Sequence, residues 1–348
     1  MTDIRFGRRS VLVSAMAAAG AAWAGPLFAQ MKPEKTKVVL AVGGKSALYY
    51  LSLTIAEKRG FFKDEGLDVE INDFAGGSRS LQALIGGSAD VVAGAYEHTI
   101  RMHARGQPIQ QFVLIGRGMQ IVIAMEKSRA DKVKGPADVK GMKFGVSAPG
   151  SSTHMLVNYW ISKAGLKPTD ISAIGVGAGA SVVAAVTKGE IDGISQTDPA
   201  VSMLDRQGMI KVVVDTRTMK GNEEVFGGPM PAACLYAKNE FLKANPGTAQ
   251  ALANAIVRAN RWLQTATPDQ VADTVPEPYL LGDREIYKTA FSRIREVISP
   301  DGIMPDKAPD TSLKFLLASD PQFKADGVVI ADTFTNEFAK RAAEKYKA

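Results

Sequence analysis

Two short runs of glycine and hydroxyl residues are the strongest candidates for ligand binding in this sequence. Gly150-Ser151-Ser152-Thr153 comes directly before a stretch with apolar residues at helical spacing, and so does Gly76-Gly77-Ser78-Arg79. The first turn of a helix has unpaired amide groups and the positive end of the helix dipole, so it can hold an anion. Hydroxyl groups add further donors. We therefore predict that these residues bind a ligand: Gly77, Ser78, Ser151, Ser152 and Thr153.

A purely structural role is the alternative for parts of both runs. A serine or threonine can simply cap the helix that follows it, although three hydroxyl residues in succession exceed what a cap needs. Glycines let the backbone approach a ligand closely, and they also form tight turns. Arg79 could clamp a carboxylate or a sulfonate, or it could extend into solvent. Both interpretations stay open for Arg79.

Residues that follow two other strand-like runs extend the candidate set. Ser46 and Tyr49 come after the apolar run 38–42, and we expect both to line the site. Adjacent residues point to different sides of a helix, so only one of Tyr49 and Tyr50 can face the ligand well. Tyr96 follows the strand-like run that begins at Val91, and its ring could stack on a planar solute.

Two acidic residues leave the charge of the ligand open to a second interpretation. Gln196 and Asp198 occupy, in the second half of the chain, the place that Tyr96 has in the first half, and we expect both to be near the ligand. Asp198 could bind a cationic group or cap the next helix. If Glu97 and Asp198 both faced the site, a cationic ligand would fit. The two helix starts favour a small organic anion, either a carboxylate or a sulfonate.

Enzyme chemistry and metal chemistry have little support. Three histidines and the single cysteine, Cys234, give no metal-ligand spacing. Gly175–Ala180 matches a loose dinucleotide fingerprint, and Asp198 lies about 20 residues further on, so an exported cofactor-dependent oxidoreductase is the alternative from another class. The fingerprint lies at the second turn of its unit, and no catalytic pair accompanies it. We predict no cofactor, no metal and no enzymatic activity.

The elements that position these residues form two related halves. Each half has a strand-like run, a helical stretch, a second strand, a second helix and a third strand. In this pairing Gly60 corresponds to Gly165 and Asp90 corresponds to Asp192. A β-α-β-α-β order predicts a mainly parallel sheet flanked by helices, with ligands beyond the carboxyl ends of its strands. The sequence therefore predicts an α/β protein of two lobes with a cleft between them.

The rest of the chain supplies the boundaries of the lobes. Residues 232–237 read as a strand, and helices are expected to begin near Pro246, Pro268 and Asp283. We expect these tail helices to pack on the first lobe and the hinges to lie at 117–120 and 238–239. Lobe I then comprises residues 36–118 and 239–348, and lobe II comprises residues 119–238.

Three motifs carry a resemblance to a known group of proteins. The run 60–70, Gly-Phe-Phe-Lys-Asp-Glu-Gly-Leu-Asp-Val-Glu, resembles a motif of the substrate-binding proteins of ABC importers. The runs 76–91 and 145–152 match as well, and the order of elements agrees over roughly residues 36–265. The group includes binders of nitrate, sulfonates, taurine and thiamine precursors. The resemblance implies the type II periplasmic-binding-protein fold and delivery of a small solute to a membrane permease. A thiamine-pathway enzyme of related fold is a further alternative, which lacks the support of clustered cysteines and histidines.

The N-terminal segment predicts export. Arg8-Arg9 precede a short apolar run, and Ala29 offers a small residue before a cut at or near Gln30. This pattern resembles a twin-arginine signal peptide over residues 1–29, and it predicts a periplasmic mature protein. The net charge of +6 comes without a basic cluster that could follow a phosphate backbone, so nucleic-acid binding is not expected. We expect a monomer.

The paired arginines give a direct test of export. We expect the double substitution Arg8→Lys with Arg9→Lys to block export of the folded protein, because the pair is the feature that distinguishes a twin-arginine signal. Cell fractionation and N-terminal sequencing of the mature protein check this. Normal export of the double variant would contradict the twin-arginine assignment.

Overall fold

The described part of the chain in this computed structural model is residues 32–347. The predicted signal peptide, residues 1–29, lies outside the described residues. Across residues 32–347, none of the helices is long and apolar enough to cross a lipid bilayer.

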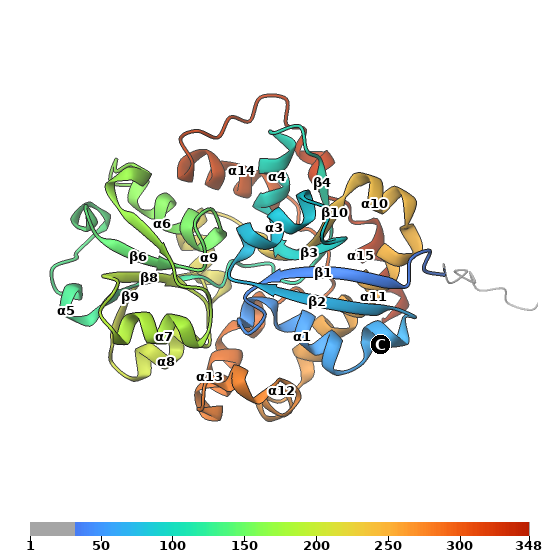
Figure 1. Cartoon of the computed structure of the whole chain (residues 1–348), viewed down its shortest axis with the longest axis horizontal. Helices are drawn as coiled ribbons and strands as arrows, with labels where there is room; N and C mark the ends of the chain where they lie inside the picture. The colour runs from blue at the N-terminus through green and yellow to red at the C-terminus, as the bar shows by residue number, and fades with distance from the viewer. Residues whose placement is uncertain (1–31, 348) are drawn as a thin grey trace, which may run out of the picture. The chain divides into compact units, whose positions relative to one another are not determined.

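The first sheet has five strands in the order β2-β1-β3-β10-β4 (Figure 1). Its strands are β1 (Lys37–Gly43), β2 (Asp68–Phe74), β3 (Val91–Ala95), β4 (Ile109–Leu114) and β10 (Ala233–Lys238). β1 pairs in parallel with β2 and β3, whereas β10 is antiparallel to both β3 and β4. The carboxyl ends of β1, β2 and β3 therefore meet at one edge of the sheet, which is where the candidate residues follow.

The second sheet repeats this arrangement with the order β7-β6-β8-β5-β9. Its strands are β5 (Val122–Glu126), β6 (Lys143–Val146), β7 (Ser172–Gly175), β8 (Gly193–Gln196) and β9 (Ile210–Asp215). β6 pairs in parallel with β7 and β8, and β5 is antiparallel to both β8 and β9. Each sheet is therefore mainly parallel, with one antiparallel strand next to its edge. The predicted α/β architecture is confirmed.

The antiparallel strand of each sheet is the one that arrives from the other lobe. β5 follows β4 of the first sheet after residues 115–121, which contain the expected hinge at 117–120. β10 follows the second sheet and the helix α9 (Met219–Phe226), and it joins the first sheet. The return crossing therefore lies at 227–232, before β10, and the expected hinge at 238–239 and lobe boundary at residue 238 are corrected accordingly. A short, fully apolar strand pattern does not reveal which of two sheets it joins.

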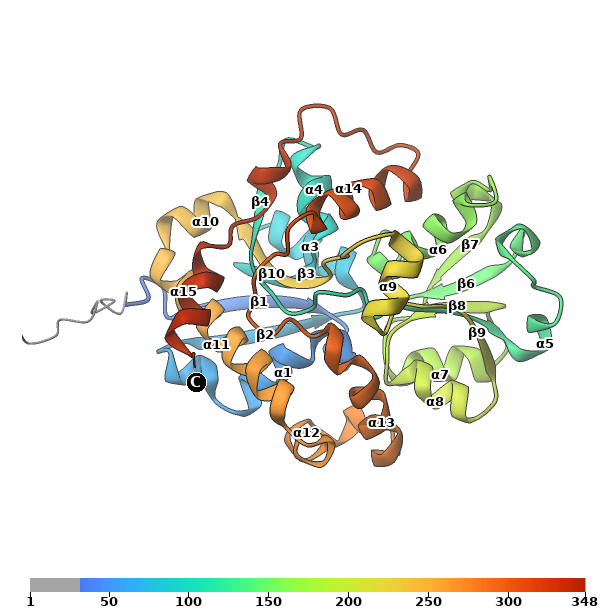
Figure 2. The ribbon, with the colours of Figure 1, turned by 180° about the vertical axis from the view of Figure 1, so that it is seen from behind.

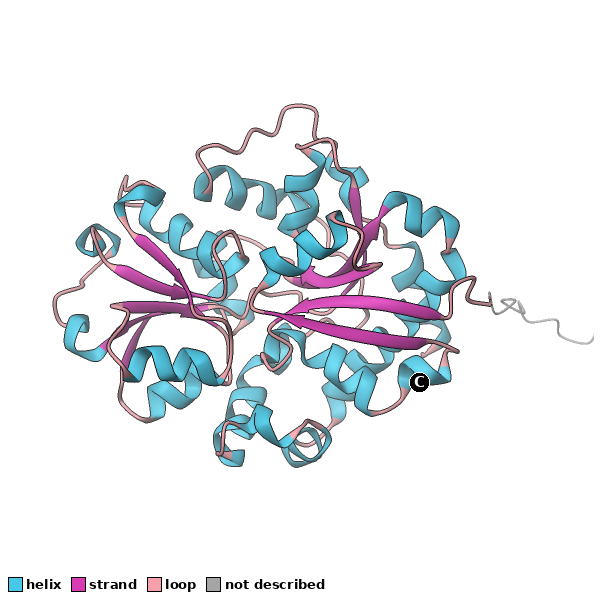
Figure 3. Cartoon of the chain, viewed as in Figure 1, coloured by secondary structure: helices cyan, strands magenta, loops and turns pink. Residues whose placement is uncertain are grey.

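Helices cover both faces of each sheet (Figure 3). Those of the first half are the 3-10 helix η1 (Leu48–Tyr50), α1 (Leu51–Lys58), α2 (Phe61–Asp64), α3 (Gly77–Ile85) and α4 (Glu97–His103). Those of the second half are α5 (Lys127–Ala130), α6 (Ser152–Ser162), α7 (Ala180–Thr187), α8 (Ala200–Arg206) and α9. The tail contributes α10 (Asn239–Ala244), α11 (Pro246–Thr265), α12 (Pro268–Thr274), α13 (Arg284–Ile294), α14 (Ala308–Ser319) and α15 (Glu337–Lys345).

Two aspartates show that the halves are built alike. Asp90 precedes β3, and its carboxylate accepts a hydrogen bond from the amide of Val39 in β1 at 2.9 Å. Asp192 precedes β8, and its carboxylate accepts one from the amide of Lys143 in β6 at 2.8 Å. The two residues that the sequence pairs therefore fix the same parallel strand contact in both sheets.

The tail helices pack on both lobes, which differs from the expectation that they pack on the first lobe alone. α11 lies against α1 and α15 in the first lobe, whereas α14 lies against α6 of the second lobe (Figure 2). The ring of Phe315 in α14 is 5.3 Å from the ring of Tyr159 and 5.7 Å from that of Phe226, measured between centroids. An aromatic cluster thus joins the tail to the second lobe.

This cluster predicts a strong effect on stability. Phe315 is 1% exposed, and truncation of a buried phenylalanine costs about 3–5 kcal/mol, so we expect Phe315→Ala to lower the free energy of unfolding by that amount. Leu317 on the same helix is 49% exposed, and Leu317→Ala should change it by less than about 0.5 kcal/mol. Urea denaturation of both variants measures the difference. Equal changes in the free energy of unfolding for the two variants would show that the packing of α14 on the second lobe does not stabilise the protein.

Candidate functional site

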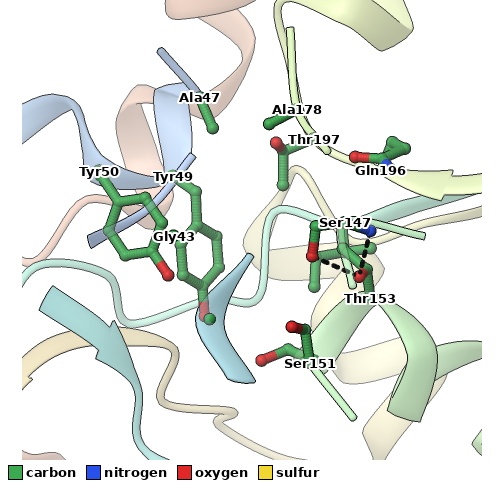
Figure 4. A pocket seen from close by; sticks show the side chains of 13 residues that line it. Gly43, Ala47, Tyr49, Tyr50, Ser147, Ser151, Thr153, Ala178, Gln196 and Thr197 are labelled. Carbon is green, nitrogen blue, oxygen red and sulfur yellow. Dashed lines mark hydrogen bonds between the residues drawn. The ribbon is translucent and has the colours of Figure 1, made fainter. Parts of the chain in front are cut away.

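A cavity lies between the lobes, where the carboxyl ends of the parallel strands of both sheets meet. About 380 Å³ of space, open solvent included, lies among the residues that line it, and the tyrosines of the first lobe face hydroxyl and amide groups of the second (Figure 4). The lining residues are Gly43, Ala47, Tyr49, Tyr50, Gly77, Ile121, Ser147, Ser151, Ser152, Thr153, Ala178, Gln196 and Thr197. None of these described residues carries a charged side chain.

Backbone contacts without side chains form the rim of this cavity. A β-carbon at position 43 would lie 2.2 Å from the carbonyl carbon of Gly76, so the end of β1 can approach the start of α3 only through glycine. A β-carbon at position 76 would lie 2.9 Å from the amide nitrogen of Ala148 in the second lobe. Such separations are too short for real β-carbons. Gly43 is thus required for the contact between β1 and α3 within the first lobe, and Gly76 for the close approach of the two lobes.

Two helices begin at the cavity, as the sequence predicts. α3 starts at Gly77 and α6 starts at Ser152. Within residues 32–347, the amide groups of Gly77, Ser152 and Thr153 have no hydrogen-bond acceptor. These amides and the positive ends of both helix dipoles give the cavity a positive potential without any lysine or arginine.

Direct hydrogen bonds between the lobes hold the cavity closed in this structure. The amide of Ser78 donates to Ser151 Oγ at 2.9 Å, and Ser78 Oγ donates to the carbonyl of Pro149 at 2.9 Å. On the other side, the amide of Leu48 donates to the carbonyl of Asp198 at 2.8 Å. The predicted ligand residues Ser78 and Ser151 therefore bind to each other across the cleft, and only Ser151 lines the cavity.

Ser152 links the cavity to a buried carboxylate. Its hydroxyl donates to Glu97 Oε1 of the first lobe, and Glu97 is fully buried. The other oxygen, Glu97 Oε2, has no hydrogen-bond partner among the described residues. Burial raises the pKa of Glu97 above its usual value, and the hydrogen bond from Ser152 opposes this only in part. Because the Ser152 hydroxyl donates its proton to Glu97, its oxygen can only accept hydrogen bonds from groups in the cavity, whereas the Ser152 amide can donate one.

The other hydroxyl groups of the cavity differ in whether they already have a hydrogen-bond partner. Thr153 Oγ1 accepts from the amide of Ser147 at 3.0 Å and shares a hydrogen bond with Ser147 Oγ at 2.9 Å. The hydroxyls of Tyr50 and Thr197 make no hydrogen bond within the described chain, and the Tyr49 hydroxyl interacts with Ser152 but has no partner at hydrogen-bond geometry. Tyr49 and Tyr50 pack edge to face with centroids 4.9 Å apart, and both line the cavity. The expectation that only one of the two tyrosines reaches the site therefore differs from the structure.

Three further predicted residues lie elsewhere or serve a structural role. Tyr96 does not reach the cavity, because its hydroxyl bonds to Thr333 in the buried tail at 2.5 Å. Ser46 lies outside the cavity, against Gly179 of the second lobe. Asp198 accepts from the amide of Ser202 in α8 at 2.9 Å, as the helix-cap interpretation expects. The carboxylate of Asp198 also lies 3.4 Å from the guanidinium of Arg217, which pairs more closely, at 2.6 Å, with Asp215.

Gln196 does line the cavity, where its side-chain amide donates to the carbonyl of Gly177 at 3.2 Å. The sequence did not single out Ser147 and Thr197 as ligand residues. Ser147 directly follows β6 and Thr197 directly follows β8, and this position after a strand is the signal that would have identified them. Arg79 extends into solvent, since it is exposed and its guanidinium donates to the side-chain oxygen of Gln82 at 3.1 Å.

The remaining chemistry-bearing side chains are buried and structural. Burial lowers the pKa of His98 to about 3, and its Nδ1 atom shares a hydrogen bond with the Tyr236 hydroxyl at 3.0 Å. Burial raises the pKa of the Cys234 thiol, so it is a poor nucleophile. Residues 32–347 contain no group of three or more potential metal ligands. The turn 175–180 packs closely on the first lobe, and a β-carbon at Gly179 would lie 2.8 Å from Ser46 Oγ.

The curated proteins similar to the chain include a binding protein and an enzyme. YtlA of Bacillus subtilis, which is provisionally named a binding protein, is 26% identical over 288 residues, or 80% of this chain and 83% of YtlA. A 4-amino-5-hydroxymethyl-2-methylpyrimidine phosphate synthase of Schizosaccharomyces pombe is 30% identical over 159 residues, which is 45% of this chain and 44% of the enzyme. The longer match is thus to a protein named for binding.

Solved structures confirm the fold. A protein of Bordetella bronchiseptica RB50 is 57% identical with a TM-score of 0.89, over 90% of this chain and 99% of that protein. The alkanesulfonate-binding protein SsuA of Xanthomonas axonopodis pv. citri, bound to MOPS, has a TM-score of 0.67 at 17% identity, over 87% of this chain and 99% of SsuA. The two-lobed periplasmic-binding-protein fold expected from the resemblance is therefore confirmed. Since the model of the NMT1-like family also matches residues 31–275, the chain belongs to the NMT1-like family.

Proposed function

We propose that this protein is the extracytoplasmic solute-binding component of an ABC importer. It captures a small molecule between its two lobes and delivers it to the permease subunits in the membrane. The proposal includes a periplasmic location and a monomeric binding protein without enzymatic activity. It is supported by the names of YtlA and SsuA, which are given to binding proteins, and by the fold that the chain shares with SsuA.

The observation that carries the proposal is the cavity between the lobes. Its lining combines unpaired amides at two helix starts with the free hydroxyls of Tyr49 and Tyr50. Unpaired polar groups in a closed cavity cost free energy, and a bound solute with complementary groups removes that cost. Such an arrangement suits reversible capture.

The same groups favour an anionic head group on the solute. Amide N–H groups and phenolic hydroxyls donate hydrogen bonds, and the two helix dipoles add positive potential at the same place. The carboxylate of Asp198, which could have favoured a cation, does not line the cavity and pairs with Arg217. A carboxylate or sulfonate, with a planar or apolar body near the tyrosine rings, therefore fits this cavity best.

Enzymatic alternatives have less support. The similarity to the pyrimidine phosphate synthase covers less than half of either chain. No cysteine, histidine or acidic side chain lines the described cavity, so a catalytic pair is missing at the place where a substrate would bind. The dinucleotide-like turn 175–180 closes against the first lobe. Capture accounts for the cavity, whereas catalysis does not.

The Tyr49 hydroxyl gives a sharp test of solute binding. It is buried and has no partner in the described chain, so Tyr49→Phe should leave the stability of the ligand-free protein unchanged or slightly higher. Loss of a hydrogen bond to a charged solute costs roughly 1.5–3 kcal/mol, or about ten- to a hundredfold in affinity. Calorimetry with benzoate, butanesulfonate, nitrate and the cation benzylamine measures this loss and the preferred charge.

Tyr159→Phe is the matched control, because the Tyr159 hydroxyl donates to the carbonyl of Val225 at 3.1 Å outside the cavity. This variant should keep its affinity and lose some stability. Binding of benzylamine alone, or equal affinity in wild type and Tyr49→Phe, would contradict the anion site.

A further inference from the structure

Glu97 is a buried carboxylate without a cation, directly behind the wall of the cavity. It reaches across the cleft to the Ser152 hydroxyl, and its second oxygen has no partner in residues 32–347. Within the same residues it forms no ion pair. A carboxylate in this position is costly if it is ionised, because neither water nor a counter-charge compensates it.

None of the groups around Glu97 supplies that compensation. The titratable groups that face it from η1, its own helix α4 and β10 are Tyr49, Tyr50, His98, Arg101, Cys234 and Tyr236. Burial raises the pKa values of the tyrosines and Cys234, and it lowers that of His98, so these side chains are neutral near pH 7. Helix α6 contributes the uncharged Ser152.

Arg101 is the one cation of this group, and it is engaged elsewhere. Its guanidinium donates to the carbonyl of Gly150 at 3.1 Å and lies 3.7 Å from the carboxylate of Asp320. It therefore acts on Glu97 only from a distance. The charge state of Glu97 depends on what enters the cavity.

An anion bound at the start of α6 would be separated from the Glu97 carboxylate by Ser152 alone. The amides of Ser152 and Thr153 would hold the anion, while the Ser152 hydroxyl contacts Glu97. Two negative charges this close together, in a closed cavity without a cation, cannot both persist. One of the two groups must be neutral in the complex.

We propose, on the basis of the function proposed above, that the cleft takes up an anionic solute together with one proton, which is held on the Glu97 carboxyl. In the open form Glu97 is hydrated and ionised. As the lobes close, the proton binds the carboxylate at Oε2, the oxygen without a partner, and Ser152 continues to donate to Oε1. The complex thus gains one anion and one proton, and its net charge does not change. The raised pKa of Glu97 in the closed structure supports this order of events.

Calorimetry in buffers of different ionisation enthalpy counts the protons directly. With benzoate, butanesulfonate and nitrate as probes, we expect uptake of up to about one proton per bound anion above the pKa of Glu97 in the open protein. Because the anion raises the pKa of Glu97, affinity should fall by up to about tenfold for each pH unit above that value, which titrations in buffers from roughly pH 5 to 9 would test.

Two variants separate this linkage from a structural effect. Glu97→Gln keeps the shape but cannot titrate, so its affinity for the anions should be independent of pH and its proton uptake should be absent. Glu65→Gln is the control, because Glu65 is also buried in the first lobe but pairs with Lys345 at 2.9 Å, away from the cavity. It should show the same proton uptake as wild type. If Glu97→Gln fails to fold, the number of protons that the wild-type protein takes up per bound anion still tests the inference.

The outcomes distinguish this inference from the proposed function. Anion binding without proton uptake, or with uptake that persists in Glu97→Gln, overturns the inference and leaves the solute-binding role intact. Binding of benzylamine with proton release overturns both the inference and the anionic ligand. Failure of every probe to bind at both ends of the pH range overturns the anionic ligand and the inference with it.

Discussion

The close approach of bare backbone at the junction of the lobes is the constraint on which the site depends. Gly43, Gly76 and Ala148 bring the end of β1, the start of α3 and the turn before α6 into contact. Only there can two helix starts from different lobes share one small cavity. A side chain at Gly76 would separate the lobes and expose the unpaired amides to water, and one at Gly43 would displace the start of α3 from the end of β1. The binding chemistry therefore rests on residues that supply no functional group of their own.

Much of this arrangement could be predicted from the sequence, because it depends on local order. The repeated strand and helix pattern predicted both sheets, and the hydroxyl run at 150–153 predicted the start of α6 at the cavity. What could not be predicted depends on partners far away in the chain. Tyr96 was assigned to the ligand because it follows a strand, yet Thr333 holds it in the core. Arg217, which pairs with Asp198, lies 19 residues further along the chain.

The two acidic residues that the sequence treats alike have opposite surroundings in the structure. Asp198 is buried beside a guanidinium, whereas Glu97 is buried beside hydroxyls and a thiol. Burial alone raises the free energy of an ionised carboxylate, and a nearby cation lowers it again. The nearby arginine is therefore the main difference between the surroundings of Asp198 and those of Glu97. No property of the local sequence distinguishes them.

The exchange of strands between the sheets also fixes an order of assembly during synthesis. All five strands of the second sheet lie between residues 122 and 215, so this sheet can close as soon as that segment has left the ribosome. The first sheet lacks β10 until residue 238, and β4 has no neighbour in the sheet without it. The lobe that begins the chain is thus the later one to be completed. Its apolar strands stay partly unpaired while the whole of the other lobe is made.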